Sequence, residues 1–100
     1  MIIKAPHPGN VTVAIQRCGY ARFIDRRGDR PSYTRRLGTG FYPRFHLYVE
    51  EKGEMIILKL HLDQKQPTYI RGHAHSGEYE GETVEREAAR LQAILSNIAL

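Results

Sequence analysis

The chain has 100 residues, of which 41% are hydrophobic, and these values predict one globular domain with a single hydrophobic core. It contains no run of about 18 apolar residues and no pattern of a signal peptide, which argues against membrane-spanning and secreted proteins. A single cysteine, Cys18, excludes an intramolecular disulfide and fits a reducing compartment, so we expect a cytoplasmic protein.

The net charge of +4 is unevenly distributed along the chain. Eight arginines and two aspartates lie between Arg17 and Arg44, which gives this segment a local charge of +6. Five glutamates and two arginines between Glu78 and Arg90 give the later segment a local charge of −3. A basic segment that is rich in arginine rather than lysine is typical of a protein that binds phosphate groups.

The first predicted element is a short helix over residues 11–18. Apolar side chains at positions 11, 14, 15 and 18 recur at helical spacing. Asn10 is a good N-cap and Gly19 suits the end of a helix. Val11 and Val13 are β-branched and favour a strand, so a strand remains an alternative here.

A hairpin is predicted next, with strands over Tyr20–Arg27 and Ser32–Leu37 that flank a Gly28-Asp29 turn. In this register Arg22 lies opposite Arg35, an arrangement of like charges that destabilises a sheet unless an anion bridges them. The sequence leaves open which face of this hairpin is buried.

Residues 43–63 form the clearest pattern, a second hairpin with two chemically different faces. Strands Arg44–Glu51 and Glu54–Asp63 alternate in polarity with a period of two, and Lys52-Gly53 is the predicted turn. The inner face is an apolar row made of Phe45, Leu47, Val49, Ile56, Leu58, Leu60 and Leu62. The outer face carries Arg44, His46, Tyr48, Glu50, Met55, Ile57, Lys59, His61 and Asp63. This register pairs His46 with Lys59, which places the two histidines diagonal to one another.

The last predicted element is a C-terminal helix that starts after Glu82. A loop precedes it over residues 72–81, and Tyr69–Arg71 is a candidate short strand. Thr83 is the expected N-cap, and an apolar stripe follows at spacings of four and three residues. We therefore predict an α+β fold: a mostly antiparallel, four-stranded meander sheet with the C-terminal amphipathic helix and the short N-terminal helix on one face.

The favoured function is binding of RNA or another polyanion by the arginine-rich hairpin and the outer face. A sheet that presents aromatic rings for base stacking among guanidiniums for phosphates is a common RNA-binding surface. The predicted nucleic-acid-binding residues are Arg22, Arg26, Arg27, Arg30, Arg35, Arg36, Arg44, His46, Tyr48, Lys59 and His61.

A small hydrolase is the first alternative. His46 and His61 beside cationic side chains have the parts of a metal-independent ribonuclease, in which one histidine removes a proton and the other donates one. Asp63 follows His61 by two residues and can orient its ring. Whether the protein is an enzyme at all stays open in the sequence.

A metal-dependent hydrolase is a variant of this alternative. His73 and His75 have the spacing of metal ligands, and Glu78, His61 or Asp63 can supply a third ligand. We otherwise expect no cofactor. A protein-interaction module that docks a partner on a sheet edge is the remaining alternative, and the oligomeric state does not follow from the sequence.

Overall fold

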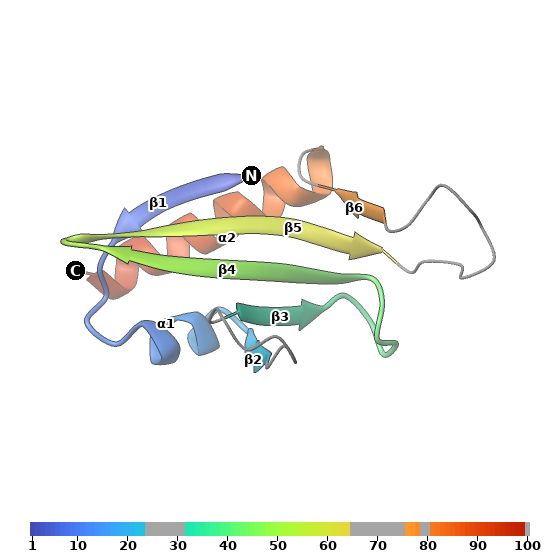
Figure 1. Ribbon diagram of the computed structural model, residues 1–100, viewed down its shortest axis with the longest axis horizontal. Coiled ribbons are helices and arrows are strands. Elements are labelled where there is room, and N and C mark those ends of the chain that lie inside the picture. The colour runs from blue at the N-terminus through green and yellow to red at the C-terminus, as the bar shows by residue number, and fades with distance from the viewer. Residues whose placement is uncertain (24–31, 65–75, 79–80, 100) are drawn as a thin grey trace.

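The computed structural model describes residues 1–23, 32–64, 76–78 and 81–99, and its architecture is α+β (Figure 1). The strands are β1 (Ile2–Pro6), β2 (Ala21–Phe23), β3 (Ser32–Arg36), β4 (Arg44–Lys52), β5 (Met55–Gln64) and β6 (Ser76–Glu78). The helices are α1 (Val11–Arg17) and α2 (Glu82–Ala99). Described strands pair antiparallel in the order β1-β5-β4-β3-β2, and β6 also pairs with β5. The predicted fold class and the meander from β2 to β5 are confirmed.

Strands β1 and β6 are missing from the sequence prediction. Both lie along the same side of β5, where β1 pairs with its first half and β6 with its last three residues. Ile3 and Ala5 of β1 are buried and alternate with exposed residues, so the period of two is present. The pattern is too short to be distinguished from a loop without its partner strand.

The turn of the central hairpin consists of Gly53 and Glu54, so the predicted turn at Lys52-Gly53 is wrong. Gly53 has a φ of 61°, a value that glycine adopts without strain and that primed hairpin turns require. The predicted register would place Glu51 opposite Glu54, whereas the observed one avoids this like-charge pair. The observed pairing of β4 with β5 is shifted by two residues from the predicted register. Because side chains alternate with a period of two, both faces of the hairpin keep their predicted side chains.

The inner face of the sheet and one side of α2 form the core. Leu47, Leu58 and Leu60 are buried on the sheet, and α2 lies behind it in Figure 1. The buried residues of α2 are Val84, Ala88, Leu91 and Leu95, together with Glu87. This spacing confirms the predicted apolar stripe.

The predicted cap of α2 is wrong by two residues. The helix begins at Glu82, and the amide of Glu85 donates to the carbonyl of Gly81. Thr83 is therefore already inside the first turn. Glu82 and Arg86, four residues apart, form an ion pair on the exposed surface of the helix. Neither of the described helices is both long and apolar enough to cross a membrane.

Residues 11–17 are helical, which resolves the choice between helix and strand. The side chain of Asn10 accepts a hydrogen bond from the Val13 amide, as expected of an N-cap. Ala14 and Ile15 are buried in the same core as the inner face of the sheet. Capping and burial of these two residues outweigh the strand preference of the β-branched positions.

The first hairpin also has a different register. Arg22 lies opposite Tyr33, not opposite Arg35, so the predicted like-charge pair is wrong. Tyr33 is 2% exposed and pairs with Leu47 on β4, which shows that its face is the buried one. The predicted turn at Gly28-Asp29 and residues 24–27 of the predicted strand lie outside the described residues.

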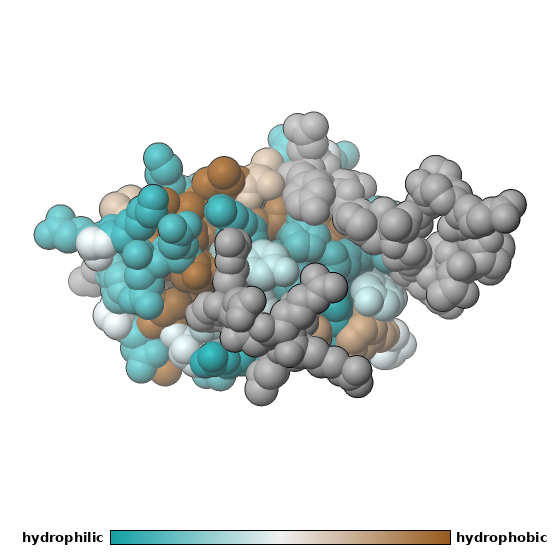
Figure 2. Space-filling model, in the orientation of Figure 1, coloured by the Kyte–Doolittle hydropathy of each residue, from teal (hydrophilic) through white to brown (hydrophobic). Residues whose placement is uncertain are grey.

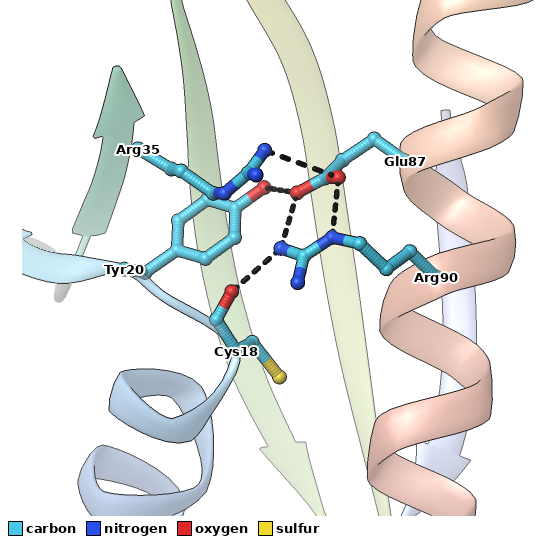
Figure 3. Close-up of polar contacts among 5 residues, drawn as sticks. All are labelled: Cys18, Tyr20, Arg35, Glu87 and Arg90. Atoms are coloured by element: carbon cyan, nitrogen blue, oxygen red, sulfur yellow. Dashed lines mark hydrogen bonds and ion pairs between the residues drawn. The ribbon is translucent and has the colours of Figure 1, made fainter. Parts of the chain in front are cut away.

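Hydrogen bonds and ion pairs around the buried Glu87 join α2 to the segment after α1 and to β3 (Figure 3). Glu87 Oε2 accepts a hydrogen bond of 2.5 Å from the hydroxyl of Tyr20. Arg90 donates from Nε to Glu87 Oε1 at 2.8 Å and from Nη2 to Glu87 Oε2 at 2.9 Å. The same Nη2 donates to the carbonyl of Cys18, and Arg35 Nη1 lies 3.5 Å from Glu87 Oε1. We call Tyr20, Glu87, Arg90 and Arg35 the Glu87 network.

The protonation states of the Glu87 network follow from its partners. Burial alone would raise the pKa of Glu87, but hydrogen bonds from Arg90 and Tyr20 and the charges of the arginines outweigh it and lower the pKa. Burial and the hydrogen bond to Glu87 raise the pKa of Tyr20 well above its ordinary range. The carboxylate is therefore ionised and the phenol neutral at physiological pH.

Candidate functional site

The face of the sheet opposite α2, which we call the outer face, carries a grid of side chains. The register aligns them in three rows across β3, β4 and β5: Ser32, Tyr48 and Lys59; Thr34, His46 and His61; Arg36, Arg44 and Asp63. Figure 2 views this face. Outside the grey atoms, hydrophilic residues cover the end at the β4–β5 turn, apolar residues form a band beside them, and mainly hydrophilic residues lie toward the end of β5.

His46, His61 and Asp63 meet within this grid, and we call them the central trio. His46 lies directly opposite His61. The predicted diagonal arrangement is therefore wrong, because the pairing of β4 with β5 is shifted by two residues from the predicted register. Asp63 Oδ1 is 2.7 Å from His61 Nε2, and Asp63 Oδ2 is 3.3 Å from His46 Nδ1. The ring centroids of the two histidines are 5.0 Å apart. One carboxylate thus contacts both imidazoles, including the predicted contact with His61.

Asp63 is ionised at neutral pH. Arg44 Nε donates to its Oδ2 at 3.4 Å. Burial alone would raise the pKa of Asp63, but hydrogen bonds from His46 and His61 and the charge of their rings outweigh it and hold the pKa well below its ordinary range. Its side chain is 20% exposed and that of His61 is 14% exposed, which leaves both accessible to a small solute.

His46 is held firmly by its neighbours. Its ring stacks on Tyr48 with centroids 4.6 Å apart, and Phe23 meets it edge-on at 5.6 Å. Its Nε2 atom is buried and makes no hydrogen bond within the described part of the chain. A buried polar atom without a partner costs about 1–3 kcal/mol. The described residues therefore leave one polar atom of this ring without a hydrogen bond.

A second group of side chains lies at the end of β3, in the connection that follows and at the start of β4, and we call Arg36, Phe41, Tyr42 and Arg44 the aromatic–arginine cluster. Phe41 and Tyr42 meet edge to face, with centroids 4.9 Å apart. The Arg44 guanidinium lies 4.3 Å from the Phe41 centroid and 4.9 Å from that of Tyr42, while Arg36 lies 5.2 Å from Phe41. Phe41 is 48% exposed and Tyr42 is 38% exposed. Both rings can therefore receive a ligand.

Phe41 and Tyr42 are absent from the set of binding residues predicted from the sequence. Two adjacent aromatic residues between arginines in a loop are the signal that points to them. The structure brings these rings near Asp63, because the side chain of Arg44 contacts both Asp63 and the rings.

The residues predicted to bind nucleic acid fall into separate groups. Exposed cations are Arg22, Arg36 and Lys59. Arginines already engaged with a carboxylate are Arg35, which contacts Glu87, and Arg44, which contacts Asp63. Rings packed together on the outer face are His46, Tyr48 and His61. Arg26, Arg27 and Arg30 lie outside the described residues. Arg22 and Arg35 share the register positions of the inner face, so the described residues of the set do not form one surface.

The predicted metal ligands of the loop, His73 and His75, lie outside the described residues. Glu78 belongs to β6, where its Cα pairs with Leu62, and Gly77 pairs with Asp63. The central trio offers another set of ligands, because one ligand atom from each residue lies within 4.8 Å of the others. Two imidazoles and a carboxylate suit transition metals such as zinc and iron.

Comparison with known proteins leaves the chain without an assigned relative. A scan against protein-family models finds no match, and searches of curated proteins and of solved structures find no significant similarity.

Proposed function

We propose that the protein binds single-stranded or looped RNA with the aromatic–arginine cluster and the exposed cations of the outer face. The observation that carries this proposal is the pair of exposed rings, Phe41 and Tyr42, flanked by two guanidiniums. Base–aromatic stacking contributes about 1–3 kcal/mol per base, and it needs bases that are not already paired. This supports unpaired RNA over a closed duplex.

The cations have different roles in this proposal. Arg36 and Lys59 are exposed at opposite ends of the grid, two rows apart, which corresponds to about 13 Å along the strands. A flexible strand of a few nucleotides can reach both side chains. Its phosphates then contact these cations and release their counterions into solution. Arg44 is 7% exposed and pairs with Asp63, so it holds the rings in place more than it attracts phosphates.

Substitution of the two rings tests the stacking contacts. We expect Phe41→Ala combined with Tyr42→Ala to weaken binding of single-stranded RNA at least about 10-fold, because two stacking surfaces are lost. Fluorescence anisotropy with a labelled RNA of 12 to 16 nucleotides measures the affinity. Leu37→Ala is the matched control, because Leu37 is 44% exposed in the same connection but has no ring.

Substitution of the cations tests the phosphate contacts. Arg36→Gln should weaken binding and reduce the slope of log affinity against log salt by about 0.7, the value for one phosphate contact on a single strand. Arg17→Gln on the exposed surface of α1 should change neither. Absence of binding by the wild-type protein at low salt, or an affinity indifferent to salt, contradicts the proposal.

Hydrolysis of RNA at the central trio is the second candidate, and the contact between His61 and Asp63 favours it. A carboxylate 2.7 Å from an imidazole nitrogen orients the ring as a general base for the 2′-hydroxyl proton. His46 is 8% exposed, so it would act on the substrate less directly than His61.

Gel assays of RNA cleavage in EDTA test this acid–base candidate. We expect His61→Ala to reduce cleavage at least about 100-fold, the lower range for a general base. His7→Ala, which removes an imidazole next to Glu51, is the control that should leave cleavage unchanged. If His46→Ala and His61→Ala both leave the rate unchanged, the candidate is wrong.

A further inference from the structure

We infer that His46, His61 and Asp63 form a binding site for one divalent transition-metal ion of the zinc class. This inference goes beyond RNA binding and does not depend on it. Among the residues that the structure describes, the central trio is the group in which three such ligand atoms lie within 4.8 Å of one another. Each ligand comes from the paired region of β4 and β5, so the backbone that carries it is held by the sheet.

The spacing of the ligand atoms suits such an ion. Zinc binds nitrogen and oxygen ligands at about 2.0–2.2 Å, which places ligands of a tetrahedral site about 3.3 Å apart. The distances to Asp63 are already 2.7 Å from His61 Nε2 and 3.3 Å from His46 Nδ1. The three ligand atoms lie within 4.8 Å of one another, so binding requires rotation of the side chains to bring all three to the ion.

The chemistry of the ligands selects the class of metal. Imidazole nitrogen favours zinc, iron, cobalt and nickel over calcium and magnesium, which prefer sites made of oxygen alone. Three protein ligands leave a coordination position for water or substrate, as catalytic zinc sites do. The partial exposure of His61 and Asp63 gives that position access to solvent.

The surroundings of the trio resemble the supporting shell of a metal site. Arg44 Nε lies 3.4 Å from Asp63 Oδ2 and fixes the orientation of the carboxylate. Tyr48 and Phe23 hold the ring of His46 between them.

Titration of metal-free protein tests the site. After removal of metals with EDTA and exchange of the buffer, we expect one equivalent of Zn²⁺ to bind in isothermal titration calorimetry and to raise the temperature of thermal unfolding. Co²⁺ should give visible absorption bands with imidazole ligation. Mg²⁺ should not compete with Zn²⁺ at a 100-fold excess. Displacement of Zn²⁺ by Mg²⁺ overturns the proposed class of metal, and absence of Zn²⁺ binding overturns the site.

Variants assign the binding to the trio. His61→Ala and Asp63→Asn should each weaken Zn²⁺ binding more than about 100-fold, because a direct ligand is worth more than the 10- to 100-fold of an outer-shell partner. His7→Ala should bind as the wild-type protein does. The double variant His73→Ala/His75→Ala distinguishes the trio from the loop: retained binding supports the trio, and loss of binding only in this variant overturns it.

A folding control keeps the assignment testable. Thermal unfolding of each metal-free variant shows whether it folds. If Asp63→Asn does not fold, because Arg44 loses its partner, His61→Gln replaces it, since glutamine keeps a polar side chain at position 61 and leaves the contact between Arg44 and Asp63 in place. A folded His61 variant that binds Zn²⁺ within about threefold of the wild-type affinity overturns the site.

Discussion

Replacement of Glu87 by alanine is expected to destabilise the protein by about 3–5 kcal/mol, the range for removal of one partner of a buried ion pair. Glu87 is 4% exposed and accepts hydrogen bonds from Tyr20 and from two nitrogens of Arg90. Without the carboxylate, a buried hydroxyl and a guanidinium lose their partner together. The contact of Arg35 with α2 is lost as well.

Urea unfolding followed by circular dichroism measures this effect. Tyr20→Phe removes one hydrogen bond to a charged group and should cost about 1.5–3 kcal/mol, less than loss of the carboxylate. Glu82→Gln on the exposed side of the same helix breaks the pair with Arg86 and should change stability by less than about 0.5 kcal/mol. Equal effects of Glu87→Ala and Glu82→Gln would show that the Glu87 network does not stabilise the fold.

The Glu87 network also predicts the pH dependence of stability. The pKa of Glu87 is lower in the folded state than in the unfolded state, so its contribution is complete above the ordinary range of glutamate, about pH 4.3. As the pH falls below that range, the unfolded state binds a proton that the folded state does not, and stability decreases. The slope of unfolding free energy against pH should therefore be smaller for Glu87→Gln than for the wild-type protein in this acidic range.

Leu47→Ala is expected to destabilise the protein by about 2–5 kcal/mol, because Leu47 is fully buried between Tyr33 of β3 and Leu60 of β5. The substitution removes apolar contacts and leaves a cavity at the centre of the inner face. The same urea experiment measures the change.

Ile57→Ala on β5 is the matched control for the opposite face. Ile57 lies on the outer face at a half-buried position, and its loss should cost less than Leu47→Ala, about 1 kcal/mol. A larger effect at Ile57 than at Leu47 would mean that the two faces are assigned the wrong way round, and the proposals for the outer face would fail with them.

The parts of the fold that are predictable from the sequence are those with a long repeating pattern. The alternation over residues 44–63 sets the two faces of the central hairpin, and the stripe of α2 identifies its buried side. The short strands β1 and β6 have five and three residues, too few to establish a period. The alternating pattern also does not determine which residues of β4 and β5 pair, because a shift of two residues leaves every side chain on the same face.

The candidate site shows the same division. The sequence alone determines that His46, His61 and Asp63 share a face, since residues two apart on a strand point the same way. Tertiary structure decides that His46 lies opposite His61, that Asp63 contacts both, and that Arg35 and Arg44 are engaged by carboxylates. The physical reason is that alternation is local to one strand, whereas register and ion pairs depend on the free energy of residues brought together from distant parts of the chain.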